Sequence, residues 1–195
     1  MKIKLIRERR VALSMGSAWY DHCYGLKKGR NYENYHPLWD TILNWITPQE
    51  GIADLGCGPG AFAERAKKAG KRYIVGVDYS EVAIRQAKER VPKWAKRFIC
   101  ADLSTYTIPR RKVDVVVMTE VLEHLPDDLS VLAKFPKGTR ILLSVPASYA
   151  VTHIRIFPTM DDAIQRYSGL LCIQKSAAQK VNMENAWLFD SVRKD

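Results

Sequence analysis

From residue 51 onward, short apolar runs alternate with amphipathic segments, and this alternation restricts the fold more than any other feature of the 195-residue chain. Short aliphatic runs indicate strands, whereas apolar residues spaced three and four apart indicate helices. Strands separated by helices pair in parallel through right-handed crossovers. We therefore predict an α/β fold with a doubly wound, mostly parallel sheet. The expected strands are 51–55, 73–78, 97–103, 113–119 and 139–146, and the expected helices between the first three are 61–70 and 80–91, with Ser80 as an N-cap.

The pattern changes after residue 158. A helical segment at 160–169 is followed by two strand-like segments, 170–178 and 186–194, on either side of a turn. Two strands joined by a short connection favour an antiparallel hairpin at one edge of the sheet. With this C-terminal hairpin the expected sheet has seven strands.

The segment ahead of the sheet is rich in aromatic residues. A length of 195 residues suits a single domain, so we expect this segment to be part of it. We expect an N-terminal helical or lid segment over 1–46 and the main domain over 47–195. The rings either cover an open face of the sheet or close the crevice at the carboxyl ends of the strands, where open α/β sheets bind ligands. The rings concerned are those of Trp19, Tyr20, Tyr24, Tyr32, Tyr35 and Trp39.

The composition is that of a globular protein, with 47% hydrophobic and 27% charged residues. No apolar run approaches the length of a transmembrane helix, and the four cysteines lack metal-ligand spacing, so we expect a cytoplasmic protein with free thiols. A net charge of +10 allows an RNA partner, but the basic residues are dispersed along the chain, which is typical of ordinary solvated faces.

The segment GIADLGCGPG joins the first expected strand to the first helix. Its glycines, Gly56, Gly58 and Gly60, permit positive φ angles and leave room for a ligand across the turn. The following helix directs its positive end and free N–H groups at the same place. This segment therefore predicts a ligand site at the mouth of the crevice.

Acidic residues end three successive strands: Asp54, Asp78 and Asp102. The carboxyl ends of parallel strands lie along one edge of the sheet, so the three acids should line one side of the crevice. An acid after the second strand can accept hydrogen bonds from both hydroxyls of a ribose, and one after the third can meet an adenine amino group. The three acids together predict a nucleoside site.

Four phrases, ADLGCGPG, VGVDYS, CADLS and VVVMTEVLEHLPD, resemble those of the class I S-adenosylmethionine-dependent methyltransferases, in particular the type 11, ubiquinone-pathway-like group that acts on small molecules. The resemblance covers about residues 35–175 and implies a Rossmann-like methyltransferase fold. It implies S-adenosylmethionine as cofactor and S-adenosylhomocysteine as product. The cofactor-binding residues that it implies are Asp54, Gly56, Cys57, Gly58 and Gly60 for the methionine part, Asp78 with Tyr79 for the ribose, Asp102 with Leu103 for the adenine, and Thr119 with Glu120 near the sulfonium.

A nicotinamide dehydrogenase is the main rival within this fold class. Its fingerprint is GxGxxG, whereas the glycines here follow GxGxG and are preceded by Asp54, which suits an ammonium group and repels pyrophosphate. The chain also lacks the length for a separate substrate domain. The pattern favours the methyltransferase.

Methyl transfer requires placement of the nucleophile in line with the S–CH₃ bond and, for a hydroxyl acceptor, removal of a proton. His153, beyond the fifth strand, and His124 are the candidate catalytic residues. On a helix, Glu120, Glu123 and His124 would share one face, and with His153 they resemble the ExxEH-plus-His metal site of some relatives. We expect no metal, and keep these four residues as the alternative divalent-metal site.

The acceptor is not fixed by the sequence. We expect an enzyme that methylates a small molecule at an oxygen, nitrogen or carbon atom. Two alternatives stay open: an RNA-directed methyltransferase, which would use the positive charge and the rings, and a catalytically silent cofactor-binding partner subunit. No oligomeric state is predicted.

Overall fold

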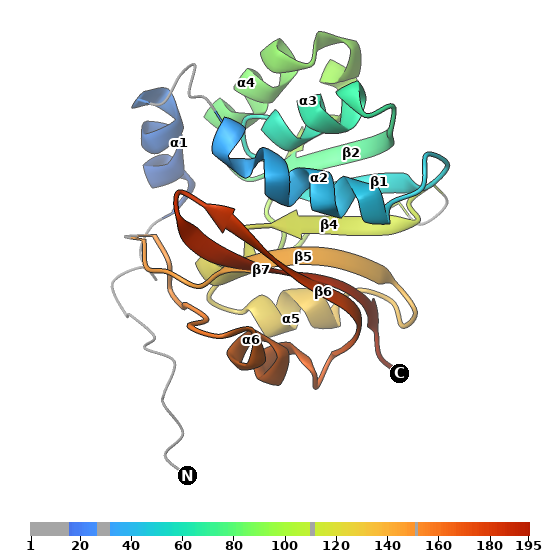
Figure 1. The fold of residues 1–195 in the computed structure, drawn as a ribbon. Coiled ribbons are helices and arrows are strands. Elements are labelled where there is room, and N and C mark those ends of the chain that lie inside the picture. Colours follow the sequence, from blue (N-terminus) through green and yellow to red (C-terminus); the bar gives the residue numbers. More distant parts are fainter. Residues whose placement is uncertain (1–15, 27–31, 110–111, 151) are drawn as a thin grey trace.

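The computed structural model describes residues 16–26, 32–109, 112–150 and 152–195. Its centre is one seven-stranded sheet in the order β3-β2-β1-β4-β5-β7-β6 (Figure 1). Strands β1 to β5 pair in parallel, and β7 pairs antiparallel with both β5 and β6. The predicted α/β sheet with an antiparallel C-terminal hairpin is confirmed. The strands are β1 (Gly51–Leu55), β2 (Arg72–Asp78), β3 (Phe98–Cys100), β4 (Val115–Thr119), β5 (Arg140–Pro146), β6 (Leu171–Val181) and β7 (Glu184–Arg193).

Helices cover both faces of the sheet (Figure 1). Strand side chains alternate between the faces, so Ile52 packs with α2, α3 and α4, whereas its neighbour Ala53 packs with α5 and α6. Each face therefore has its own apolar core. The helices are α1 (Ser17–Leu26), α2 (His36–Trp45), α3 (Ala61–Lys68), α4 (Glu81–Arg90), α5 (Asp128–Ala133) and α6 (Met160–Tyr167), with short 3₁₀ turns η2 (Glu33–Tyr35), η3 (Pro92–Arg97) and η4 (Leu122–His124).

Local capping fixes where two of these helices begin. The Ser80 hydroxyl accepts a hydrogen bond from the Ala83 N–H at 3.1 Å, as its predicted N-cap role requires. Thr159 and Asp162 form a capping box at the start of α6. The expected helices at 61–70, 80–91 and 160–169 all form, each ending within a few residues of its expected bound.

The expected helix over Glu120, Glu123 and His124 does not form, and this prediction was wrong. Glu120 directly follows β4 with a φ of 56°, and only the 3₁₀ turn η4 comes after it. The Glu120 N–H is held by β5, because it donates to the Ser144 carbonyl and hydroxyl oxygens. Pro126 disfavours helical geometry at Leu125, the residue before it, so η4 ends at His124.

The N-terminal rings divide between the two expected roles. The side chain of Trp39 on α2 is 6% exposed and packs in the core beside Ile52 and Phe62. Trp19, Tyr20 and Tyr24 on α1 instead line cavities at the carboxyl ends of the strands. The predicted boundary between 1–46 and 47–195 stays a prediction, and residues 1–15 and 27–31 lie outside the described residues.

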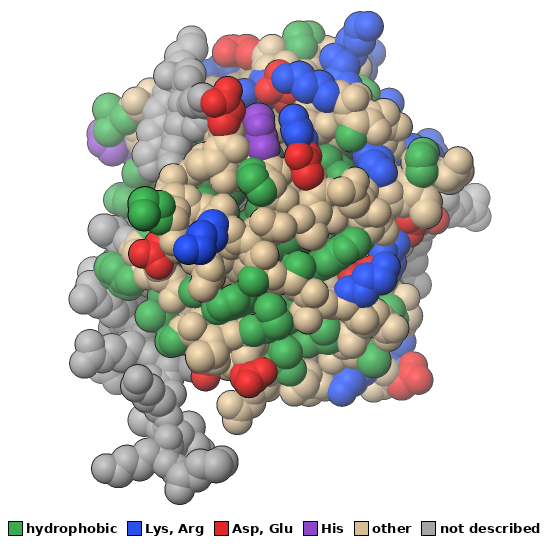
Figure 2. All heavy atoms as spheres, viewed as in Figure 1, with side chains coloured by type: hydrophobic (Ala, Val, Ile, Leu, Met, Phe, Trp, Pro, Cys, Tyr) green, Lys and Arg blue, Asp and Glu red, His purple; other side chains and the backbone are tan. Residues whose placement is uncertain are grey.

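The surface in Figure 2 shows hydrophobic side chains over β6 and β7, with basic side chains interspersed with acidic ones. Basic residues gather in short runs at 7–10, 27–30 and 109–112. The first two runs and two positions of the third lie outside the described residues. Within the described ranges, no helix is both long and apolar enough to cross a bilayer.

Candidate functional site

Two adjoining cavities open at the carboxyl ends of the parallel strands. The Asp54 cavity, of about 530 Å³, is bordered by the glycine turn, Asp54, the N-terminal rings and the turn between β6 and β7. The Asp78 cavity, of about 370 Å³, is bordered by Asp78, Asp102 and the segment around η4. The two share wall residues, so a single elongated ligand can extend from one into the other. The shared residues are Tyr20, Tyr24, Gly56, Glu120 and His124.

The glycine turn has positive φ at all three glycines, 79° at Gly56, 50° at Gly58 and 76° at Gly60. The protein's own packing also requires two of them. A Cβ on Gly56 would lie 2.4 Å from a Val121 methyl group, and one on Gly60 would lie 2.9 Å from the Ala87 Cβ. The glycines of this turn therefore have two explanations. They leave room for a ligand, and they avoid clashes with Val121 and Ala87 inside the fold.

Asp54 is buried at the end of β1 and lines the cavity named after it. Burial raises its pKa to about 7, and a hydrogen bond from the Tyr73 hydroxyl to Oδ2, at 2.8 Å, acts in the opposite direction. Tyr73 comes from β2 and stacks on Trp94. Its role was not predicted, because no sequence pattern links a tyrosine in one strand to an acid in the next.

Asp78 ends β2 and shapes the turn above it. Its Oδ2 accepts from the Gly58 N–H at 2.9 Å, and its Oδ1 accepts from the Ser80 N–H at 3.0 Å. Asp78 also lines the Asp78 cavity. Tyr79 and Leu103 line the same cavity, with Asp102, whose Oδ1 accepts from the Ser104 N–H. The structure thus brings Asp78 and Asp102 to one cavity, while Asp54 and Cys57 line the other.

Thr119 and Glu120 lie at the end of β4, and Glu120 borders both cavities. The Glu120 Oε1 accepts from the Ser144 hydroxyl on β5 at 2.8 Å. Burial raises the pKa of Glu120 to about 7, and the Ser144 hydrogen bond lowers it in part. Ser144 was missed in the sequence, since a single serine within an apolar strand gives no distinguishing signal.

Glu123, His124 and His153 come together although their predicted helical spacing is absent. His124 Nδ1 lies 3.0 Å from the Thr152 carbonyl oxygen, so Nδ1 carries the proton and Nε2 has a free lone pair. Burial lowers the pKa of His124 to about 4 and also lowers that of His153, so both imidazoles are neutral near pH 7. Burial and the adjacent Glu120 raise the pKa of Glu123.

Arg155, which was not predicted as part of the site, holds the segment that carries Glu123 and His124. Its guanidinium donates to the carbonyl oxygens of Leu122, Leu125 and Pro126 and lies 3.4 Å from the Asp128 carboxylate. The Ile154 N–H donates to the Glu123 carbonyl at 2.9 Å. The segment 153–155 therefore holds the turn after β4 against the loop after β5.

The cluster of Glu123, His124 and His153 has the donor set of a divalent-metal site. One ligand atom from each residue lies within 4.8 Å of the others, and neither Glu123 oxygen has a hydrogen-bond partner. Two imidazoles and a carboxylate suit zinc or manganese. Glu120, the fourth residue of the alternative metal set, is not part of this cluster among the described residues. The residues present fit an ion, and the sequence alternative stays a prediction.

Comparison with known proteins agrees with this geometry. Residues 52–137 match the methyltransferase domain family. A trans-aconitate 2-methyltransferase of Agrobacterium fabrum is 32% identical over 114 residues, which are 55% of this chain and 43% of the relative. The chain spans between 17% and 54% of the length of these curated relatives.

Two solved structures cover the whole chain. A 1,6-didemethyltoxoflavin-N1-methyltransferase of Burkholderia thailandensis, with bound S-adenosylhomocysteine, has a TM-score of 0.71 at 15% identity, and 93% of it is covered. The magnesium protoporphyrin IX methyltransferase of Synechocystis PCC 6803, with bound S-adenosylmethionine, has a TM-score of 0.66 at 17% identity and is covered completely. Residues 52–137 of this chain thus match a methyltransferase domain, and the chain has the fold of class I S-adenosylmethionine-dependent methyltransferases.

Proposed function

We propose that the protein is an enzyme that transfers the methyl group of S-adenosylmethionine to a small-molecule acceptor. The observation that carries this proposal is the pair of adjoining cavities, one bordered by Asp78 and Asp102 and the other by the glycine turn and Asp54. The two are joined where a sulfonium would have to lie, beside Gly56 and Glu120. Solved structures of the same fold contain bound S-adenosylmethionine or S-adenosylhomocysteine, which supports the choice of cofactor.

The cofactor is placed by matching charges and donors. The adenosine occupies the Asp78 cavity, where the Asp78 carboxylate accepts from the ribose hydroxyls and Asp102 accepts from the adenine amino group. The methionine arm crosses the glycine turn into the Asp54 cavity, and its ammonium meets the Asp54 carboxylate. The backbone of Cys57 and Gly58 lies beside the methionine arm in this turn. Thr119 and Glu120 flank the sulfonium.

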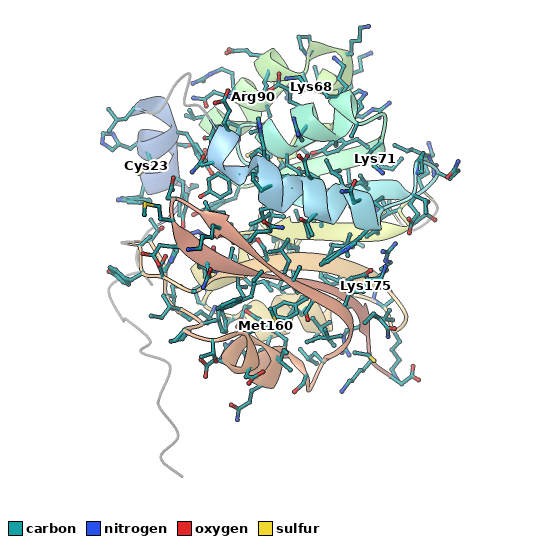
Figure 3. The ribbon with its side chains drawn as sticks, in the orientation of Figure 1. Cys23, Lys68, Lys71, Arg90, Met160 and Lys175 are labelled. Atoms are coloured by element: carbon teal, nitrogen blue, oxygen red, sulfur yellow. The ribbon has the colours of Figure 1, made fainter. Side chains whose placement is uncertain are left out.

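Helix α1 is proposed as the lid over this cofactor. Tyr20 and Tyr24 from α1 line both cavities, and Tyr20 also contacts the Tyr79 and His124 rings. None of the residues of α1 is buried, so the helix is attached by few contacts and can move without disrupting the core. Cys23, which lines the Asp54 cavity, is labelled on this helix in Figure 3.

His124 and His153 are proposed as the residues that face the reacting acceptor. The two rings lie 5.0 Å apart between centroids and both line the Asp54 cavity. As a neutral imidazole whose Nδ1–H is bonded to the Thr152 carbonyl, His124 keeps the Nε2 lone pair, which can receive a hydrogen bond from the acceptor. His153, also neutral, can help to orient that acceptor. The hydrogen bond from His124 to the Thr152 carbonyl fixes which nitrogen performs this role.

Methyl-labelled S-adenosylmethionine tests this proposal directly. The protein is incubated with the labelled cofactor and with fractionated cell extract, and label is followed into small molecules and macromolecules. Label in a low-molecular-weight fraction, absent when Asp78→Ala replaces the wild type, is the expected result. Label only in RNA, or none in any fraction despite cofactor binding, would contradict a small-molecule methyltransferase.

A further inference from the structure

Resting on the function proposed above, we infer that the methyl acceptor is an organic amine on a flat apolar body, held in the Asp54 cavity with its nitrogen at Glu123. Three features of the cavity carry this inference: buried polar atoms without partners, the sign of the charges in the wall, and the rings that complete it.

Unpartnered buried polar atoms gather in this cavity. Five buried side-chain nitrogen or oxygen atoms of the described residues have no hydrogen-bond partner, and three of them belong to residues lining it: Trp39 Nε1, Glu123 Oε1 and Glu123 Oε2. The nearest basic atom to Glu123 is His124 Nε2, at 3.5 Å from Oε1. Because such groups are rare and costly in folded proteins, a ligand that supplies their partners is expected here.

The two Glu123 oxygens distinguish between acceptor classes. Burial and Glu120 raise the pKa of Glu123, and the positive sulfonium beside Glu120 in the proposed complex favours its ionised form. As a carboxylate, Glu123 accepts at both oxygens: a primary amine has two or more N–H groups and can donate to both, whereas a hydroxyl has one donor and a carboxylate ligand has none. The Trp39 N–H is a donor, so it requires a hydrogen-bond acceptor atom on another part of the methyl acceptor. The unpartnered atoms therefore favour a nitrogen at Glu123 and disfavour a carboxylate in that place.

The charge of the wall has the same consequence. Its described lining residues include four acids, Asp54, Glu120, Glu123 and Glu184, and no lysine or arginine. Arg90, which is labelled in Figure 3 and lies 5.6 Å above the Tyr32 ring, is bonded to Pro59 and Glu64 instead of lining the cavity. With no lysine or arginine among its described residues, this wall offers no cationic partner to a polycarboxylate acceptor, although several curated relatives are named trans-aconitate 2-methyltransferases.

Aromatic rings form the remaining wall and indicate a flat apolar body. Tyr35 and Trp39 stack at 5.5 Å with an interplanar angle of 21°, and Phe62 packs edge-on against Trp39. Ring faces also attract a neighbouring positive charge. The rings that line the cavity are those of Trp19, Tyr20, Tyr24, Tyr32, Tyr35, Trp39, Phe62 and Tyr149.

The reaction moves a positive charge into these surroundings. The lone pair of the neutral amine forms the N–CH₃ bond while the electron pair of the S–CH₃ bond returns to sulfur. The sulfonium becomes the neutral thioether of S-adenosylhomocysteine, and the nitrogen becomes a methylammonium ion. Glu123 and the rings then stabilise the charge where it arises, which is the arrangement that accelerates a transfer step. The extra proton leaves the nitrogen to solvent after release.

Matched acceptors test this inference. With saturating S-adenosylhomocysteine, the binding of tryptamine is compared by calorimetry with that of tryptophol and indole-3-propionate, and 2-phenylethylamine with 2-phenylethanol and 3-phenylpropionate. We expect each amine to bind at least tenfold more tightly than its alcohol and its acid, and labelled cofactor to methylate the amine nitrogen. Equal or tighter binding of the alcohol or acid in both series, or no binding of either amine, would overturn the inference.

Variants assign the preference to Glu123. Glu123→Gln keeps the shape of the side chain and should reduce amine binding about tenfold while leaving S-adenosylhomocysteine binding unchanged. Glu89→Gln, an exposed acid on α4, is the control and should change neither. Trp39→Phe should weaken acceptor binding to a smaller extent. Unchanged amine binding in Glu123→Gln would overturn the assignment, whereas failure of the wild type to bind S-adenosylhomocysteine would instead contradict the proposed function.

Discussion

Asp54 is a buried carboxyl group whose ionisation depends on Tyr73, a side chain of the neighbouring strand. Burial raises its pKa to about 7, and the Tyr73 hydrogen bond favours the charged form. In the proposed complex the carboxylate must be ionised to meet the cofactor ammonium. Below pH 7 a growing fraction of Asp54 is protonated, and binding then has to release that proton. Cofactor affinity should therefore fall as the pH decreases, by up to about tenfold per pH unit.

In Tyr73→Phe, the loss of cofactor affinity on acidification should begin at a higher pH than in the wild type. The variant keeps the ring that stacks on Trp94 but removes the donor to Asp54, so the pKa of Asp54 should rise further. Calorimetric titrations with S-adenosylhomocysteine at several pH values between about 6 and 9 measure the midpoint. Tyr106→Phe, a tyrosine outside both cavities, is the matched control. A midpoint that is the same in Tyr73→Phe and wild type would contradict this role of Tyr73.

The cluster of Glu123, His124 and His153 gives a second prediction at this scale. If Glu123 receives the acceptor nitrogen, it cannot also ligate an ion, so methyl transfer should be unchanged by excess EDTA. Activity that EDTA abolishes and manganese or zinc restores would favour the metal alternative. In that case, equilibrium dialysis should show loss of the bound ion in the paired variant His124→Ala with His153→Ala.

At the scale of elements, α1 is tied to the start of α4 by one carboxylate. Asp21 Oδ1 accepts from the Ser80 hydroxyl at 2.5 Å and from the Val82 N–H at 3.1 Å, and the Gln86 amide donates to the Tyr24 carbonyl. These bonds hold Tyr20 and Tyr24 over the two cavities. A lid with so few attachments can open at small free-energy cost.

Asp21→Ala should release this lid. Amide hydrogen exchange over 17–26 should become faster and cofactor affinity should fall several-fold, while the melting temperature changes little because α1 buries none of its residues. Asp40→Ala is the control, since it removes a surface ion pair between α2 and Arg65 without touching α1. Unchanged exchange in Asp21→Ala would show that this carboxylate does not hold the helix.

The turn between β6 and β7 borders the Asp54 cavity and contains backbone strain. Asn182 and Met183 both have positive φ, 49° and 69°, as in a two-residue hairpin turn that prefers Asn-Gly. The Met183 side chain is 88% exposed, so it makes little packing contact that would offset this strain.

Met183→Gly should therefore raise the free energy of unfolding by roughly 0.5–1 kcal/mol, since a non-glycine residue in this region costs about 1–2 kcal/mol and glycine loses part of that gain through its more flexible unfolded state. Urea denaturation measures the change. Met183→Ala retains the strain and should be close to wild type. Equal stability of the glycine and alanine variants would contradict a strained turn.

At the scale of the whole molecule, the sheet was predictable because its signals are local. Each parallel strand is a short aliphatic run, and two helix starts have their own capping residues, Ser80 and Thr159. The places of the three acids were predictable for the same reason, since the ends of β1 and β2 and the turn after β3 bring Asp54, Asp78 and Asp102 to two adjoining cavities. Patterns of this kind need no knowledge of which strands become neighbours.

What depended on neighbours was not predictable. The turn after β4 was expected to be helical, but Ser144 on β5 and the Arg155 clamp hold it in another conformation. Tyr73 reaches Asp54 only because β1 and β2 are adjacent. The β6–β7 turn reaches the cavity only because β7 pairs antiparallel with β5, which brings this turn to the carboxyl ends of the parallel strands. Glu123 and the two histidines still come together, through the contact between two loops in place of a helix face.

The most direct test of the account is a calorimetric titration of the whole chain with S-adenosylhomocysteine. We expect saturable binding of one ligand per chain, severely weakened in Asp78→Ala, which removes the carboxylate that we propose meets the ribose and that accepts from the Gly58 and Ser80 N–H groups. Asp114→Ala, which removes an acid outside both of these cavities, should bind normally. No heat and no thermal stabilisation with either S-adenosylhomocysteine or S-adenosylmethionine would contradict it.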